Sequence, residues 1–154
     1  MEKEQIKIRR GADTFANSAI ILEKFTKAGI NGDNFPNGHQ EIMVQNFIPE
    51  IVLKAFSCEL FLKSLIKNDN IKKIHKLDEL FECLNKDDKD TIRESIIQFK
   101  SQKDSYTNDN FNSDLERVAN AFVDWRYFYE KPRSINIEFL NVLFIILREY
   151  THRK

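Results

Sequence analysis

The spacing of apolar residues constrains the fold of this chain more than any other feature. Between residues 12 and 28 the apolar side chains recur at steps of three and four, at Ala12, Phe15, Ala16, Ala19, Leu22 and Phe25. Such steps place side chains on one face of an α-helix. The chain also has only four glycines and three prolines, which is few for the many tight turns of an all-β protein. The sequence therefore predicts an all-α fold.

The same reasoning divides the chain into helices and loops. We expect helices over 12–28, 49–67, 77–84, 92–99, 113–131 and 135–150, with loops at 29–47 and 104–112. Pro49 suits the first turn of a helix, and "SDLE" (113–116) is a capping box for the fifth helix. Pro132 ends that helix, while the role of the long loop 29–47 stays open. These features predict one domain over residues 1–154, an up-and-down bundle of five to six helices with its core at about 12–150.

The charge of the chain is balanced. Lys and Arg total 24, Asp and Glu also total 24, and the net charge is zero. This balance excludes nonspecific nucleic-acid binding driven by an overall basic excess. Local contacts to nucleic acid remain candidates at Lys72, Lys73 and Lys76, and Tyr127 is a candidate for stacking on a base. The competing interpretation of these residues is a solvated surface and ordinary helix packing.

The sequence also bears on compartment and cofactors. The charged start predicts no signal peptide, and the longest apolar run, 139–147, is far shorter than the ~20 residues of a membrane span. Cys58 and Cys83 lie in helical patterns without a CxxC motif, which indicates reduced, buried thiols. We therefore expect a cytoplasmic protein that has no contact with a membrane and uses neither a metal nor a cofactor.

Two opposite charges lie on faces that should be buried. On a helical wheel Glu59 falls within the apolar arc of its helix, and Arg126 does the same in the fifth helix. An unpaired buried charge is costly, so we expect Glu59 and Arg126 to form an ion pair, with His75 as a third member. Glu130, one turn beyond Arg126, is a competing partner. A cluster with a purely scaffolding role is the alternative to a functional site.

Three stretches resemble the HEPN family of small prokaryotic helical domains: "AFSCELFLKSLI" (55–66), "IHKLDELFECL" (74–84) and "WRYFYE" (125–130). The family pattern has a glutamate, a histidine and a late arginine in this order, which are Glu59, His75 and Arg126 here. Lys63 and Leu77 match the pattern as well. The resemblance covers about residues 12–150.

The resemblance implies a bundle of four or five helices that usually forms a homodimer. Active HEPN members are metal-independent endoribonucleases with an arginine, four to six further residues and then a histidine. The histidine acts as a base toward a ribose 2′-hydroxyl, and the arginine stabilises charge on the phosphate. No histidine follows Arg126 within that window. "REYTH" (148–152) places Arg148 and His152 one turn apart with three residues between them, and a basic C-terminal turn without function is the competing interpretation.

These observations lead to three functional hypotheses. The first is an RNA- or nucleotide-associated HEPN-like domain of a bacterial phage-defence or toxin–antitoxin system, with a degenerate ribonuclease motif. The second is a noncatalytic scaffold that pairs with a partner protein such as a nucleotidyltransferase. The third is an active ribonuclease that uses Arg126 or Arg148 with His152 or His75. A homodimer is also expected, because Trp125, Phe128, Phe139 and Tyr150 add apolar surface to the last two helices.

Overall fold

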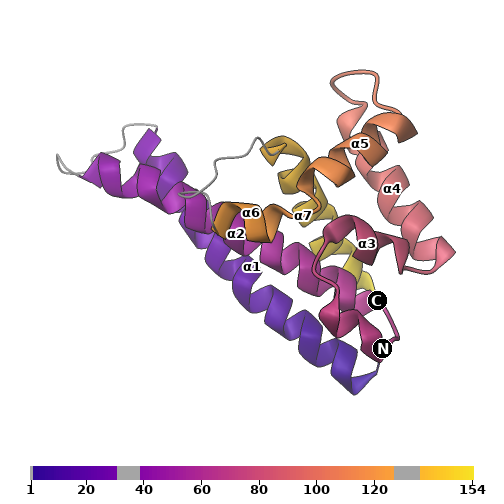
Figure 1. The fold of residues 1–154 in the computed structure, drawn as a ribbon. Coiled ribbons are helices and arrows are strands. Elements are labelled where there is room, and N and C mark those ends of the chain that lie inside the picture. Colours follow the sequence, from indigo (N-terminus) through magenta and orange to yellow (C-terminus); the bar gives the residue numbers. More distant parts are fainter. Residues whose placement is uncertain (1, 31–38, 127–135) are drawn as a thin grey trace.

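The computed structural model describes residues 2–30, 39–126 and 136–154, and it gives the backbone alone at 29–30, 39–45, 69–70 and 126. Over these residues the chain forms seven α-helices and one 3-10 helix, without a strand (Figure 1). The elements are α1 (Lys3–Ile30), α2 (His39–Leu65), η1 (Asp69–Lys73), α3 (Leu77–Glu82), α4 (Lys86–Lys100), α5 (Asn108–Val118), α6 (Ala121–Arg126) and α7 (Ile137–Arg153). The prediction of an all-α helical bundle is confirmed.

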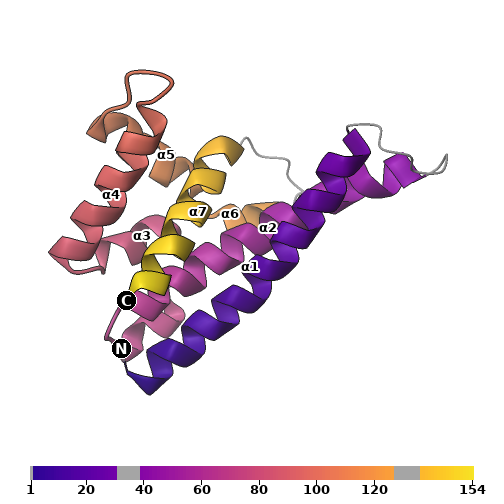
Figure 2. The same cartoon turned by 180° about the vertical axis from the view of Figure 1, so that it is seen from behind.

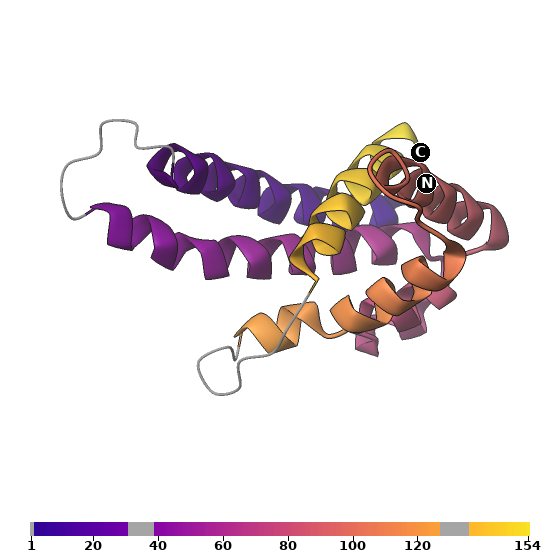
Figure 3. The same ribbon diagram turned by 90° about the horizontal axis from the view of Figure 1, so that it is seen from above.

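The two longest helices, α1 and α2, form an antiparallel pair that carries the rest of the fold. They run side by side along most of their length (Figure 3). Small residues on α1, Ala12, Ala16 and Ala19, are fully buried, which lets the two backbones approach closely. Ala55 and Cys58 of α2 are equally buried. The small side chains that recur every three or four residues on α1 therefore pack against α2 in a close helix–helix contact.

The remaining helices complete the core around α2. Helix α7 crosses α2 and lies between it and α4, as the view from behind shows (Figure 2). Three aromatic rings in contact connect α3, α5 and α7: the ring centroid of Phe111 lies 5.3 Å from that of Phe81 in a tilted arrangement and 5.8 Å from that of Phe139 in an edge-to-face arrangement. All three are fully buried. None of the described helices is both long and apolar enough to cross a membrane.

Both long helices begin earlier than we expected. Helix α1 starts at Lys3 rather than near residue 12, and Gln5 near its start is buried despite the charged sequence around it. Helix α2 starts at His39, so Pro49 lies inside it and does not open it. A proline inside a helix removes one backbone hydrogen bond. Here Pro49 is exposed to solvent, and Glu50 and Ile51 beside it are buried in the contact with other helices. The part of the expected loop at 31–38 lies outside the described residues.

The fifth predicted helix is in fact two helices. Helix α5 starts at Asn108, within the expected loop, and its capping box consists of Thr107 and Asn110 rather than "SDLE". The helix is interrupted before α6, where the carbonyl of Ala119 accepts a hydrogen bond of 2.9 Å from the backbone N–H of Leu77. This contact with the start of α3 uses a carbonyl that a continuous helix would need. The expected end at Pro132 lies outside the described residues.

The apolar residues that suggested a dimer surface are largely buried within one chain. Trp125 and Phe139 belong to the core, and Tyr150 is partly buried against it. Phe128 lies outside the described residues. The argument was therefore wrong for Trp125 and Phe139, and the homodimer itself stays a prediction. Cys83 also differs from expectation: it is exposed, whereas Cys58 is buried.

Candidate functional site

Glu59 anchors the polar cluster that the sequence singled out. It is 1% exposed, in agreement with its place on the apolar arc of α2. Its Oε1 accepts a hydrogen bond of 2.8 Å from Lys63 Nζ and lies 3.0 Å from His75 Nδ1. Its Oε2 is buried and has no hydrogen-bond partner among the described side chains. We call Glu59, Lys63 and His75 the Glu59 cluster.

Local structure explains how the three members of the Glu59 cluster meet. Lys63 follows Glu59 by one helical turn, which brings the two side chains together on α2. His75 comes from the segment between η1 and α3, and its side chain is 57% exposed. A carboxylate at Nδ1 selects the tautomer and leaves Nε2 as the nitrogen available to solvent or to a ligand. The cluster thus pairs one buried carboxylate with one accessible imidazole.

The structure does not describe the expected ion pair between Arg126 and Glu59. Its backbone ends α6, but its side chain lies outside the described residues, as do Tyr127 and Glu130. The Glu59–Arg126 pair therefore stays a prediction. The unpartnered Oε2 of Glu59 is the atom to which a guanidinium would donate.

Arg148 and His152 lie side by side on α7, and both contact α1. Arg148 Nη2 donates to Asn17 Oδ1 at 3.0 Å, and His152 Nε2 lies 2.7 Å from Asp13 Oδ1. We call these four residues the α1–α7 seam. The sequence placed Arg148 and His152 on one helix face but did not find their partners. The one-turn spacing of Asp13 and Asn17 on α1 was the available signal.

Two of the three lysines predicted to contact nucleic acid are paired with carboxylates. Lys72 Nζ lies 2.8 Å from Glu4 Oε1, and Lys76 Nζ lies 3.0 Å from Glu79 Oε1. The hydrogen bond that Lys72 donates lowers the pKa of the Glu4 carboxyl, and the hydrogen bond that Lys76 donates to Glu79 raises the pKa of Lys76. Lys73 is exposed. Local acidic partners therefore oppose the use of Lys72 and Lys76 as phosphate contacts.

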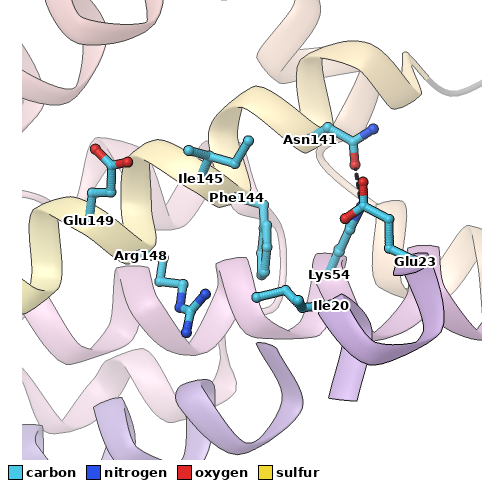
Figure 4. Close-up of a pocket in the computed structure, with 8 residues that line it drawn as sticks. All are labelled: Ile20, Glu23, Lys54, Asn141, Phe144, Ile145, Arg148 and Glu149. Atoms are coloured by element: carbon cyan, nitrogen blue, oxygen red, sulfur yellow. Dashed lines mark hydrogen bonds and ion pairs between the residues drawn. The ribbon is translucent and has the colours of Figure 1, made fainter. Parts of the chain in front are cut away.

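A second buried charge cluster was missed entirely by the sequence analysis. Lys54 of α2 is only 2% exposed, and its Nζ donates to Glu50 Oε1 and Asn141 Oδ1, both at 2.8 Å. Glu23 Oε2 of α1 lies 3.1 Å from the same nitrogen (Figure 4). Burial would raise the pKa of Glu23, but hydrogen bonds from Lys27 and Lys54 outweigh it and the pKa is lowered. One ammonium thus joins α1, α2 and α7.

A pocket of about 210 Å³ lies beside this cluster, between α1 and α7. Its apolar walls are Ile20, Phe144 and Ile145, and its polar lining consists of Glu23, Lys54, Asn141, Arg148 and Glu149. Ile20 of α1 points toward the ring of Phe144, and the guanidinium of Arg148 extends from α7 toward α1 (Figure 4). The pocket therefore combines an apolar wall with two cations and two carboxylates.

A third polar cluster holds the end of α7. The buried Asp88 of α4 accepts hydrogen bonds from the Tyr150 hydroxyl at 2.5 Å and from Asn85 Nδ2 at 2.8 Å, and its Oδ1 lies 2.9 Å from Lys154 Nζ. Burial acts to raise the pKa of Asp88, but the hydrogen bonds from Tyr150 and Lys154 prevail and lower it. We interpret this cluster as structural, because it ties α7 to α4.

In the part of the chain that the structure describes, no group of three or more His, Cys, Asp or Glu side chains is arranged to hold a metal ion. Burial raises the pKa of the Cys58 thiol far above its usual range, so this thiol stays protonated. A protonated thiol is a poor metal ligand and nucleophile.

Compared with known proteins, the chain matches no family model, no curated protein and no solved structure.

Proposed function

We propose that this chain is a HEPN-like domain that associates with RNA or a nucleotide in a bacterial phage-defence or toxin–antitoxin system. The observation that supports this proposal is the Glu59 cluster. Glu59, Lys63 and His75 are three of the residues on which the resemblance depends, and they are joined by contacts of 2.8 and 3.0 Å. Residues that match a family pattern and also meet in space are better support than the pattern alone.

The proposed domain binds rather than cleaves RNA. A metal-independent ribonuclease needs a base free to take the 2′-hydroxyl proton and an arginine aimed at the phosphate. His152 Nε2 lies 2.7 Å from Asp13 Oδ1, so this base is already engaged, and the Asp13 carboxylate beside it repels a phosphate. Arg126 has no histidine in the family window. We therefore expect weak RNA binding that falls steeply with salt, without cleavage at a ribonuclease's rate.

The test uses labelled single-stranded RNA with the parent protein and with Arg126→Ala, His75→Ala and His152→Ala variants, each first checked for folding by circular dichroism. We expect a salt-dependent mobility shift and intact RNA in every lane. Cleavage by the parent in the presence of a chelator, abolished by His152→Ala or His75→Ala, would contradict the proposal and favour the active ribonuclease. Absence of any binding at low salt would refute the proposed association with RNA.

A noncatalytic interaction module is the second candidate, and the charge pairing favours it. Lys72 and Lys76 are bound to Glu4 and Glu79, whereas a nucleic-acid surface would keep its cations free. Such a module pairs with a second copy or with a partner such as a nucleotidyltransferase. Multi-angle light scattering at micromolar concentration tests the homodimer. A single monomeric species would exclude the homodimer. Co-expression with a neighbouring nucleotidyltransferase gene would then test the other partner.

A further inference from the structure

The structure assigns a binding site for a small organic anion to the pocket between α1 and α7: a ligand with a compact apolar body and one carboxylate, which Arg148 holds. This inference is independent of the RNA-associated function and uses a different part of the molecule. The pocket volume of about 210 Å³ has room for about seven water-sized groups. That space accepts one ring or one branched side chain.

The walls of the pocket select an apolar body. Ile20 and Phe144 face each other across it (Figure 4). Ile145 stands at its rim and is 43% exposed, which makes it one of the few large apolar side chains that the fold leaves in water. A ligand that covers Ile145 would remove this apolar surface from solvent, and burial of apolar surface favours binding.

Arg148 supplies the anchoring charge. Its Nη2 donates to Asn17, and the remaining N–H groups of the guanidinium have no partner among the described residues. The acidic neighbours are already engaged: Glu149 Oε2 lies 3.2 Å from Arg153 Nη2 and Glu23 binds Lys54 and Lys27. The Glu149 carboxylate also points away from Arg148 (Figure 4). An arginine with free donors at the mouth of an apolar pocket is suited to hold a carboxylate through two parallel hydrogen bonds.

Lys54 does not compete for the ligand. Its three donors are directed at Glu50, Asn141 and Glu23, so its charge is neutralised within the protein. Asn141 accepts from Lys54 through Oδ1, and its amide N–H groups have no partner among the described side chains. They offer a second, neutral donor at the far end of the pocket from Arg148. The site therefore accepts one negative charge at Arg148, and the ligand places its apolar body against Phe144.

Two sources can supply this chemistry: a free aryl or branched-chain carboxylic acid, or the C-terminal residue of a peptide. Phenylacetate is the probe for the first source, with phenylacetamide as its neutral counterpart. N-acetyl-phenylalanine is the probe for the second, with N-acetyl-phenylalaninamide as its counterpart. Each pair differs in charge and keeps the apolar body. The measurement is a titration followed by backbone amide chemical shifts, which report both the affinity and the place of binding.

We expect saturable binding of a carboxylate probe in the millimolar range, with the largest shifts at Ile20 and Phe144. The neutral amides and the Arg148→Gln variant should bind roughly tenfold more weakly or worse, since a charge-assisted pair is lost. Ile145→Asp should weaken binding similarly. The matched controls are Arg10→Gln, which removes an exposed arginine of α1 outside the pocket lining, and Ile21→Asp, an isoleucine that is 67% exposed and does not line the pocket. Both should bind like the parent.

Tighter binding of the peptide analogue assigns the source to a C-terminal residue, and tighter binding of phenylacetate assigns it to a free acid. Three results would overturn the proposal: no saturable binding of either acid, equal binding of acid and amide, or equal loss in the Ile145→Asp and Ile21→Asp variants. None of these three results depends on RNA. Measurements of RNA binding on the same variants therefore test the proposed function separately from the anion site.

Discussion

Lys54→Met tests whether the buried ammonium holds α1, α2 and α7 together. The substitution keeps the length of the side chain and removes its charge. Of the three oxygens that lose a partner, Glu50 matters most, because its side chain is only 6% exposed. Glu23 keeps Lys27, and Asn141 faces the pocket. Loss of one member of a buried ion pair destabilises a protein by about 3–5 kcal/mol. For a chain of this size that corresponds to a fall in Tm of about 6–20 °C.

The assay is urea unfolding followed by circular dichroism at neutral pH. Lys27→Met is the matched control: Lys27 also binds Glu23, but its side chain is 68% exposed, and an exposed pair contributes about 1 kcal/mol or less. The double variant Lys54→Met with Glu50→Gln should recover most of the lost stability, since the buried charge is removed with its partner. The reasoning is refuted if Lys54→Met unfolds at the same urea concentration as Lys27→Met, or if the double variant is no more stable than the single one.

Three further predictions concern other side chains. In the native protein Cys83 should react with a thiol reagent and Cys58 should not, because one is exposed and the other is buried with a raised pKa; two reactive thiols in the folded state would contradict this. The lowered pKa of Asp88 adds stability that is fully present above its ordinary value of 3.8 and is lost as the pH falls through the lower folded value. Asp88→Asn should therefore show a smaller loss of Tm than the parent between neutral pH and strong acid, and equal losses would count against the assignment. Glu59→Ala and Arg126→Ala should each destabilise by about 3–5 kcal/mol if they form the predicted pair, and a double-mutant cycle without coupling would disprove it.

The sequence by itself determined the fold class, because the three- and four-residue steps of Ala12, Ala16 and Ala19 are a local property of the chain. It also identified Glu59 as a charge on a buried face, since helix periodicity places this residue on the apolar arc, and it predicted His75 as a member of the same cluster. Helix boundaries were less predictable. Pro49 is a helix-starting residue by local rules, but the contact between α1 and α2 stabilises a helix that continues through it.

Only the tertiary structure decided the partners of the polar side chains. Lys54 is joined to Asn141, Arg148 to Asn17 and His152 to Asp13, across 87, 131 and 139 residues of sequence. No spacing rule connects residues so far apart. A lysine or a histidine on a helix is compatible with either solvent or a buried partner, and the choice depends on which helix crosses it. In this protein α7 crosses α2 close to α1, and this crossing supplies the partners of these side chains. The same crossing forms the pocket beside Arg148.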